Sequence, residues 1–271
     1  MGKSTKKPFK DLIINNNPKS AFAEAIKSIK TNIQFSSING DFKIILLTSP
    51  APGDGKSFVS ANLAAAFAQE DKKVLIIDAD LRRGRQHKIF NIKSDTNQSY
   101  STLIVYAKRT SEKKINFKQF LHKTYITTLS LLPAGPVPPN PLELLSSETN
   151  KEIISALRNS YDIIIIDCPP VIGLSDAIVL SKLSDINLIC VTSGRTKYEQ
   201  LSKAKEAFTK TNSKLHGVIL NRVNTKGHSY STYYADKYYT DGYYSDEPES
   251  GEDNNYVKAK SNHKHKTKKG Q

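Results

Sequence analysis

Nine residues in the first quarter of the chain, Ser49-Pro-Ala-Pro-Gly-Asp-Gly-Lys-Ser57, constrain its fold more than any other stretch. They follow an apolar run at 43–48 and precede a helical pattern at 58–69. A strand, a glycine-bearing turn, Lys-Ser and a helix cradle phosphate groups, because backbone N–H groups and the helix N-terminus face the anion. In such a loop Lys56 reaches the β- and γ-phosphates and the Ser57 hydroxyl binds Mg²⁺. On its own the motif predicts phosphate binding.

Carboxylates follow two other apolar runs. Asp78 and Asp80 come at the end of Val74-Leu-Ile-Ile-Asp-Ala-Asp80, and Asp167 ends Asp162-Ile-Ile-Ile-Ile-Asp167. A site for Mg²⁺ and ATP needs metal ligands, acceptors for metal-bound waters and a group that orients or deprotonates the nucleophile. Three carboxylates and the Ser57 hydroxyl meet that requirement. The plain alternative, turn aspartates that end strands, is weakest for Asp78 and Asp167.

The order of elements predicts an α/β fold. Strands expected at 43–48, 73–78, 126–133, 162–167, 186–192 and 216–220 alternate with helical patterns, among them 20–36, 143–160 and 197–210, whereas residues 94–124 are ambiguous. Such alternation predicts a parallel sheet with helices on both faces, as in P-loop NTPases, and ligands at the carboxyl ends of its strands. We expect a mobile basic arm at 1–17, one domain at 18–225, and a flexible tail at 226–271.

Charge and cysteine content exclude several classes. Of the net charge of +14, ten lysines lie in two acid-free end segments, so the middle of the chain is close to ordinary and nucleic acid is not an expected partner. The lysine-rich ends are either solvated arms or segments attracted to an anionic membrane surface. The two cysteines fall in buried-looking strands and predict reduced thiols. Without a secretory signal or a membrane-spanning run, the expected location is intracellular.

Tyrosines gather near the C-terminus, interleaved with acids, serine and glycine and with few aliphatic residues. Such a segment cannot bury enough apolar surface to fold alone. The cluster consists of Tyr230, Tyr233, Tyr234, Tyr238, Tyr239, Tyr243, Tyr244 and Tyr256.

Taken together, these motifs resemble the bacterial tyrosine kinases of capsular and exopolysaccharide synthesis, of the cytoplasmic type that pairs with a separate membrane activator. The resemblance covers about residues 18–256. It is carried by the loop at 49–57, Ile-Asp-Ala-Asp-Leu-Arg-Arg at 77–83, the proline-rich stretch at 132–145, Ile-Asp-Cys-Pro-Pro at 166–170, Gly-Val-Ile-Leu-Asn at 217–221, and the tyrosine cluster.

The resemblance implies roles for matching residues. Asp78 would be the base, or the orienting group, for an attacking tyrosine hydroxyl. The implied catalytic residues are Lys56, Asp78 and Asp80; the implied metal ligands are Ser57, Asp80 and Asp167; and the implied nucleotide-binding residues are Gly53, Asp54, Gly55, Lys56, Ser57, Phe58, Asn221 and Arg222. The tyrosine cluster would be phosphorylated in trans within a ring of subunits.

Assembly and partners follow from the same resemblance. Glu24, Lys27 and Lys30 occupy the place of a family interface motif that carries arginines at the second and third positions, and lysine keeps the charge but loses the bidentate fork. A solvated helix face is the alternative for these residues. Implied partners are a membrane activator of the polysaccharide co-polymerase type, which recruits the chain to the inner face of the cell membrane, a cognate tyrosine phosphatase and protein substrates.

Three departures and two rival functions remain. Pro50 replaces the usual first glycine of the loop, Gly84 stands where the family has proline, and Cys168 stands where threonine is common. The main rival is a partition- or septum-positioning ATPase, but such proteins carry a lysine where this chain has Ala51. The second rival is a non-enzymatic, nucleotide-gated regulator of polysaccharide export.

Overall fold

The computed structural model describes residues 11–36, 42–93, 97–110 and 116–223. The chain divides into two units, residues 1–224 and 225–271. The tyrosine cluster, the rest of the predicted tail and the first ten residues lie outside the described residues, so the expectations for them stay predictions.

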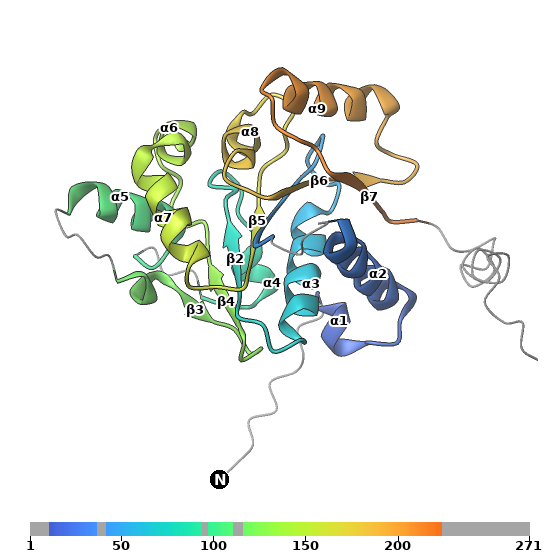
Figure 1. The fold of residues 1–271 in the computed structure, drawn as a ribbon, viewed down its shortest axis with the longest axis horizontal. Coiled ribbons are helices and arrows are strands. Elements are labelled where there is room, and N and C mark those ends of the chain that lie inside the picture. The colour runs from blue at the N-terminus through green and yellow to red at the C-terminus, as the bar shows by residue number, and fades with distance from the viewer. Residues whose placement is uncertain (1–10, 37–41, 94–96, 111–115, 224–271) are drawn as a thin grey trace, which may run out of the picture. The chain divides into compact units, whose positions relative to one another are not determined.

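One sheet dominates the described residues and confirms the predicted fold class. Its seven strands lie in the order β3-β4-β2-β5-β1-β6-β7, and every neighbouring pair is parallel except β3 and β4 (Figure 1). The strands are β1 (Ile44–Thr48), β2 (Val74–Asp78), β3 (His122–Lys123), β4 (Leu129–Leu132), β5 (Ile163–Asp167), β6 (Ile186–Thr192) and β7 (Gly217–Asn221).

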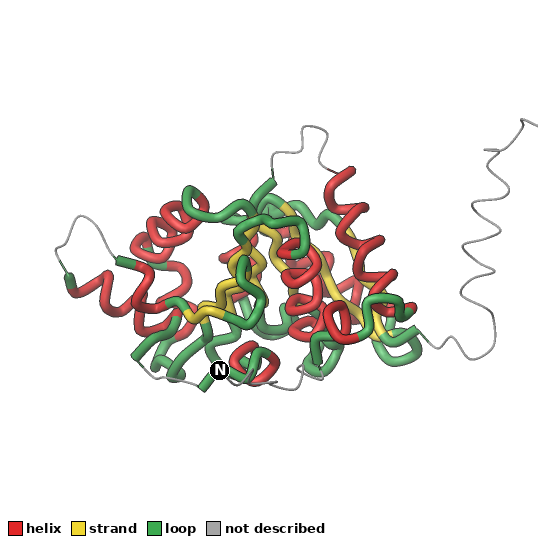
Figure 2. The backbone as a smooth tube through the Cα atoms, turned by 90° about the horizontal axis from the view of Figure 1, so that it is seen from below, coloured by secondary structure: helices red, strands yellow, loops and turns green. Residues whose placement is uncertain are grey.

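Helices cover both faces of the sheet (Figures 1 and 2). One face packs against α1 (Ile13–Asn16), α2 (Ala21–Ser36), α3 (Lys56–Ala68) and α4 (Gln86–Ile89). The other packs against α5 (Tyr100–Arg109), α6 (Pro141–Ser146), α7 (Glu148–Arg158), α8 (Asp176–Ser181) and α9 (Tyr198–Lys210), with the short 3₁₀ helix η1 (Phe117–Phe120). Alternate residues of β1 enter the two cores, Ile45 and Leu47 on the first face and Ile44 and Leu46 on the second. This explains why the strand is apolar without interruption.

The N-terminal boundary predicted at residue 17 is wrong in part. Leu12 and Ile14 are fully buried, and α1 packs on the sheet-facing helices. The buried Asn62 side chain of α3 holds the segment by accepting a hydrogen bond from the Ile14 N–H at 3.1 Å and donating one to the Asp11 carbonyl at 3.0 Å. The polar segment around α1 is thus anchored to the folded domain by buried Leu12 and Ile14 and by the hydrogen bonds of Asn62.

The carboxyl ends of the central strands meet at one edge. Asp78 at the end of β2 pairs in register with Asp167 at the end of β5, and Leu47 of β1 pairs with Asp167 from the other side. The loop after β1 therefore opens beside both carboxylates, as predicted. The ambiguous stretch at 94–124 contains α5, whose Tyr100, Leu103 and Ile104 are buried.

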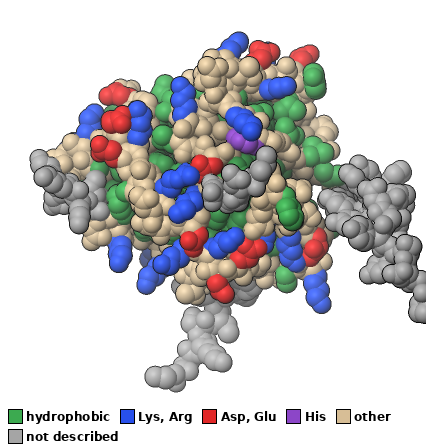
Figure 3. Space-filling view, viewed as in Figure 1, with side chains coloured by type: hydrophobic (Ala, Val, Ile, Leu, Met, Phe, Trp, Pro, Cys, Tyr) green, Lys and Arg blue, Asp and Glu red, His purple; other side chains and the backbone are tan. Residues whose placement is uncertain are grey.

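Surface charge in the described part of the chain is mixed: basic and acidic side chains are interspersed on the face in Figure 3. None of the described helices is both long and apolar enough to cross a membrane.

Candidate active site

The loop between β1 and α3 begins the site. Gly53 and Gly55 have φ of 89° and 91°, a left-handed conformation that glycine adopts without a steric cost. Helix α3 starts at Lys56, so the N–H groups of Lys56, Ser57 and Phe58 belong to its first turn and lack partners within the helix. They are the donors that the predicted phosphate cradle would use. The Phe58 ring itself turns to α2, where it packs 5.0 Å from the Phe22 ring.

Asp54 holds the loop in shape. Its Oδ2 accepts a hydrogen bond from the Ala51 N–H at 3.1 Å, and its Oδ1 accepts one from the Thr196 hydroxyl at 2.9 Å. Its carbonyl accepts one from Asn221 Nδ2 at 2.9 Å. Arg195 also donates to the Gly53 carbonyl at 3.2 Å. The side chain of Asp54, expected to bind nucleotide, is thus engaged by its own loop and by Thr196 after β6, while its backbone carbonyl is held by the last residue of β7.

Asn221 and Arg222 differ in their positions. Asn221 ends β7 and lies against the phosphate loop, since a Cβ placed on Gly55 would be 2.1 Å from Asn221 Nδ2. Arg222 is exposed and has a positive φ of 57°, and its N–H donates to Asn221 Oδ1 at 2.9 Å. The structure therefore brings Asn221 to the loop and leaves Arg222 at the surface next to it.

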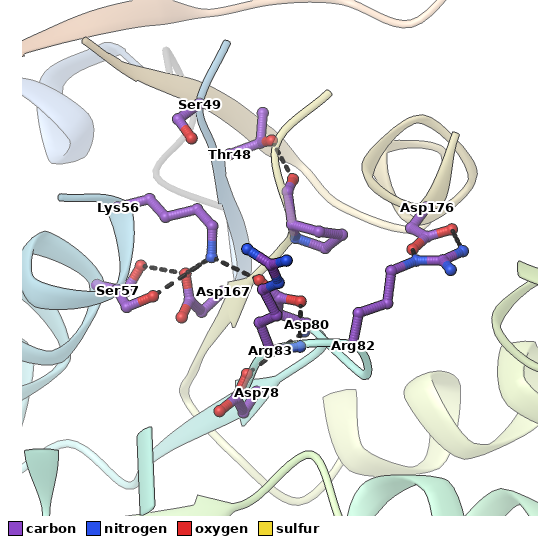
Figure 4. Close-up of polar contacts among 12 residues, drawn as sticks. Thr48, Ser49, Lys56, Ser57, Asp78, Asp80, Arg82, Arg83, Asp167 and Asp176 are labelled. Atoms are coloured by element: carbon purple, nitrogen blue, oxygen red, sulfur yellow. Dashed lines mark hydrogen bonds and ion pairs between the residues drawn. The ribbon is translucent and has the colours of Figure 1, made fainter. Parts of the chain in front are cut away.

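Lys56 joins the loop to two carboxylates (Figure 4). Its Nζ lies 3.2 Å from Asp80 Oδ2, 3.4 Å from Asp167 Oδ1 and 3.3 Å from the Ser57 hydroxyl. Only 8% of Lys56 is exposed. Burial lowers the pKa of its ammonium, but the charges of Asp167, Asp80 and Asp78 outweigh burial and raise the pKa above its ordinary value. Lys56 is therefore a permanent cation among acids.

Asp78 is fully buried and has no direct hydrogen bond to Lys56. Its Oδ2 accepts a hydrogen bond from the Gln86 N–H at 2.9 Å, and its Oδ1 accepts one from the Asp80 N–H at 3.3 Å. Burial, followed by the charge of Asp167, raises the pKa of Asp78 to about 8. The three predicted carboxylates thus meet, and Asp78 is poised to exchange a proton near neutral pH.

The departure at Gly84 has a steric explanation. A Cβ at this position would lie 2.8 Å from Asp78 Oδ2 and 2.5 Å from the Ala134 Cβ. The absence of a side chain lets the segment after Asp80 close over Asp78. The proline that the family resemblance leads one to expect here would bring a Cβ into these contacts.

The double arginine separates into two environments. Arg82 Nε donates to Asp176 Oδ2 at 3.1 Å and so ties the segment to the start of α8. Asp176 is fully buried, so this ion pair compensates its charge. The Arg83 N–H donates to Asp80 Oδ1 at 2.9 Å, and its guanidinium is drawn on the Lys56 side of the segment in Figure 4.

The donor set suits Mg²⁺. Carboxylate and hydroxyl oxygens are the ligands that this hard cation prefers. Within the described part of the chain, no group of three acidic, histidine or cysteine side chains converges on a metal-sized point. Mg²⁺ is usually held by one or two carboxylates, with waters and substrate phosphates completing the shell. Ser57, Asp80 and Asp167 are the residues in position to hold it.

Sequence reasoning missed Gln86. This residue opens α4, is fully buried and contacts Ser57, Asp78 and Asp167. Glutamine carries no motif of its own, and the spacing from Asp78 gives no signal. Thr196, Arg195 and Asp176 were also missed, because their contacts join segments far apart in the chain.

The interface candidates lie outside the site, on α2. Lys27 pairs with Glu24 at 2.7 Å and also donates to the Pro18 carbonyl at 3.2 Å. Lys30 forms an ion pair with Glu70 at the end of α3. The structure therefore gives both lysines partners within the chain, and their role in assembly stays a prediction.

Known proteins with the same arrangement decide the family. A family model described as an AAA domain matches residues 42–217. The tyrosine-protein kinase YwqD of Bacillus subtilis (strain 168) is 39% identical over 228 residues, which cover 84% of this chain and 92% of the relative. The chain belongs to the bacterial tyrosine-protein kinases. This confirms the predicted family and enzyme class.

Solved structures agree with that family. The crystal structure of the chimerical protein CapA2B2 has a TM-score of 0.72 and 36% identity, covering 80% of this chain and 91% of the other. The kinase domain of the Escherichia coli tyrosine kinase ETK has a TM-score of 0.69 and 28% identity, covering 80% and 82%.

The rival ATPase class is more distant. The septum site-determining protein MinD of Pyrococcus horikoshii OT3, solved with Mg-ADP, has a TM-score of 0.53 and 25% identity, covering 69% of this chain and 72% of the other. The kinase relatives are closer in both sequence and structure.

Proposed function

We propose that the protein is an ATP-dependent protein-tyrosine kinase that phosphorylates its own C-terminal tyrosine cluster in trans. The observation that carries the proposal is the buried Lys56 ammonium between Asp80 and Asp167, with Asp78 at the same sheet edge. A phosphate cradle with a cation, two metal-binding carboxylates and a further acid contains every part that phosphoryl transfer requires.

Each residue has a separate task in this proposal. Lys56 and the first-turn N–H groups of α3 hold the β- and γ-phosphates. Ser57, Asp80 and Asp167 hold Mg²⁺ and its waters, and the metal supplies charge neutralisation on the phosphates. The tyrosine oxygen bonds to the γ-phosphorus as the bond from that phosphorus to the β–γ bridging oxygen breaks. The hydroxyl proton passes to the ionised form of Asp78, whose pKa of about 8 places proton exchange near neutral pH.

Access to Asp78 is a requirement of this mechanism. Because Asp78 is enclosed, with Gly84 packed over it, the segment that carries Gly84 has to move before a tyrosine hydroxyl makes contact. A membrane activator that binds close to the nucleotide is one way to supply that movement. We propose such a protein, of the polysaccharide co-polymerase type, as the partner that places the kinase at the inner face of the cell membrane.

The remaining parts of the proposal concern regulation. Copies assemble into a ring, so that each tail enters a neighbour's site. Each phosphate adds about −1.5 to −2 charges to the stretch from Tyr230 to Tyr256, which already holds seven acids and one lysine. The added charge favours release of this stretch from a carboxylate-rich site. A cognate phosphatase resets the tail, and the cycle regulates capsule or exopolysaccharide synthesis and export, with other proteins as further substrates.

The decisive experiment measures phosphotyrosine. Purified protein and the cytoplasmic fragment of its activator are incubated with Mg²⁺ and ATP, and the products are blotted and mapped by mass spectrometry. We expect phosphate on the cluster from Tyr230 to Tyr256. A matched Lys56→Met chain gives no signal. An unlabelled wild type favours the rival roles of ATPase or nucleotide-gated regulator.

Transfer between molecules needs its own test. A Lys56→Met chain with an intact tail is mixed with an active chain that lacks residues 226–271. We expect the intact tail of the inactive chain to become phosphorylated. If that tail stays unlabelled while the shortened enzyme labels another protein substrate, transfer is not intermolecular.

A further inference from the structure

Gln86 contacts three residues of the candidate site, Ser57, Asp78 and Asp167. Its Nε2 donates to Asp167 Oδ2 at 2.8 Å and to the Ser57 carbonyl at 3.0 Å, while its backbone N–H donates to Asp78 Oδ2 at 2.9 Å. One residue at the start of α4 therefore connects the phosphate loop with the carboxylates that end β2 and β5.

The orientation of the Gln86 amide follows from its neighbours. A carbonyl oxygen and a carboxylate can only accept hydrogen bonds, so the NH₂ group faces both of them. The Oε1 atom is then the group left over. Among the residues that the structure describes, it is the buried side-chain oxygen or nitrogen without a hydrogen-bond partner.

An enclosed acceptor without a donor costs about 1–3 kcal/mol. Native structures keep such an atom where a water, an ion or a functional group completes it. Oε1 shares a carbon with the nitrogen that contacts Asp167, so a donor that reaches it lies next to that carboxylate. A water bound to Mg²⁺ at Asp167 is a donor of the required kind and carries protons to spare.

We propose that Gln86 is a positioning residue for the metal: its NH₂ group fixes Asp167 against the phosphate loop, and its Oε1 accepts a hydrogen bond from a Mg²⁺-bound water. The inference rests on the nucleotide site of the proposed function. It adds a residue that holds no phosphate and no metal directly. Outer-shell partners of this kind typically change metal affinity by about 10- to 100-fold when replaced.

The test separates metal positioning from general stability. Binding of the fluorescent nucleotide mant-ADP is measured with Mg²⁺ and with EDTA in wild type and in Gln86→Met, which keeps chain length without hydrogen-bonding groups. We expect Mg²⁺ to tighten binding in wild type and this gain to shrink about tenfold or more in the variant. Affinity in EDTA is expected to change by less than about twofold, because Gln86 does not contact the nucleotide.

A matched control uses another buried amide. Asn62 is fully buried on α3, the helix that begins at Lys56, but its contacts hold the segment that contains α1. We expect Asn62→Leu to lower the melting temperature and to keep the full Mg²⁺ gain. The inference is overturned if folded Gln86→Met keeps the gain, if Asn62→Leu loses it equally, or if wild type shows no gain.

A second variant covers a failure of Gln86→Met to fold. Gln86→Glu keeps the side-chain length but turns a carboxylate toward Asp167 and the Ser57 carbonyl, so we again expect the Mg²⁺ gain to fall, and an unchanged gain overturns the inference. In the kinase assay, a higher Mg²⁺ concentration is expected to restore part of the lost rate. The binding readout stands if no phosphotyrosine is formed, so failure of the proposed function and failure of this inference are distinguishable.

Discussion

The ammonium of Lys56 lies 3.2 Å from Asp80 Oδ2, so the group proposed to bind phosphate contacts a carboxylate proposed to hold the metal. Nucleotide and Mg²⁺ therefore do not enter a neutral cavity. In the proposed mechanism, bound phosphates would draw the ammonium from Asp80 and Asp167, and Mg²⁺ held there would supply positive charge beside those carboxylates. The exchange couples binding of the nucleotide with binding of the metal.

Lys56→Met is expected to lower stability as well as abolish phosphotyrosine. The variant leaves Asp78, Asp80 and Asp167 close together without their cation, and loss of one partner from a buried ion pair costs about 3–5 kcal/mol. Urea unfolding without nucleotide measures the loss. The matched control is Lys72→Met, which removes a half-exposed ion pair with Glu70 and should cost below about 1 kcal/mol. Equal effects in the two variants contradict the prediction.

Gly55→Ala is expected to lower mant-ADP affinity by about tenfold or more. The substitution meets a φ of 91°, where a side chain costs about 1–3 kcal/mol, and a clash with Asn221 Nδ2 at 2.1 Å. Gly173→Ala is the control, since Gly173 has a φ of 82° with open space around it. That variant should lose stability but keep affinity within about twofold, because it suffers the same strain without the clash. A similar loss of affinity in both variants would rule out the clash as the cause.

The repeated apolar runs made the sheet predictable. Strands β1, β2, β5 and β6 are buried on both faces, so their sequences carry a long hydrophobic signal, and the carboxylates after β2 and β5 mark one edge. The two-residue strand β3 carries no such signal, because it is defined by pairing with β4. Helix α5 escaped prediction because its buried residues stand among polar ones.

The sequence predicted those site residues that belong to a recognisable motif. Lys56, Asp78 and Asp167 stand at motif positions, and the sheet brings them together. Asp54 was expected to bind nucleotide but instead holds the loop. The sequence did not show this, because its partners Thr196 and Asn221 lie more than 140 residues further along the chain. Gln86 could not be identified from the sequence for the same reason. Its three contacts, with Ser57, Asp78 and Asp167, form only when the chain folds.

The two thiols are expected to resist alkylation in the native protein. Cys168 and Cys190 are free and fully buried. Burial, with a smaller effect from Asp54, raises the pKa of Cys190 to about 12, and burial with the charge of Asp167 raises the pKa of Cys168. Iodoacetamide at about pH 8 should label neither thiol, because the thiolate is the reactive form, and both in urea. Rapid native labelling of either thiol would contradict the prediction.

Asp78→Asn is expected to change the pH dependence of stability. The folded-state pKa of Asp78 is about 8 against an ordinary value of 3.8, so folded protein holds a proton that the unfolded chain releases between these values. This contribution to stability is present at low pH and is lost as pH rises through about 8, by up to 1.36 kcal/mol per pH unit.

Asparagine does not titrate. The unfolding free energy of the variant minus that of wild type should therefore rise by about 2–3 kcal/mol between about pH 5 and pH 7, measured by urea unfolding without nucleotide. The variant also turns an NH₂ group toward one of two N–H donors, but that cost is the same at every pH and cancels in the slope. Parallel curves for the two proteins would show that Asp78 ionises normally in the fold, and its assignment as the base would then lack its proton affinity.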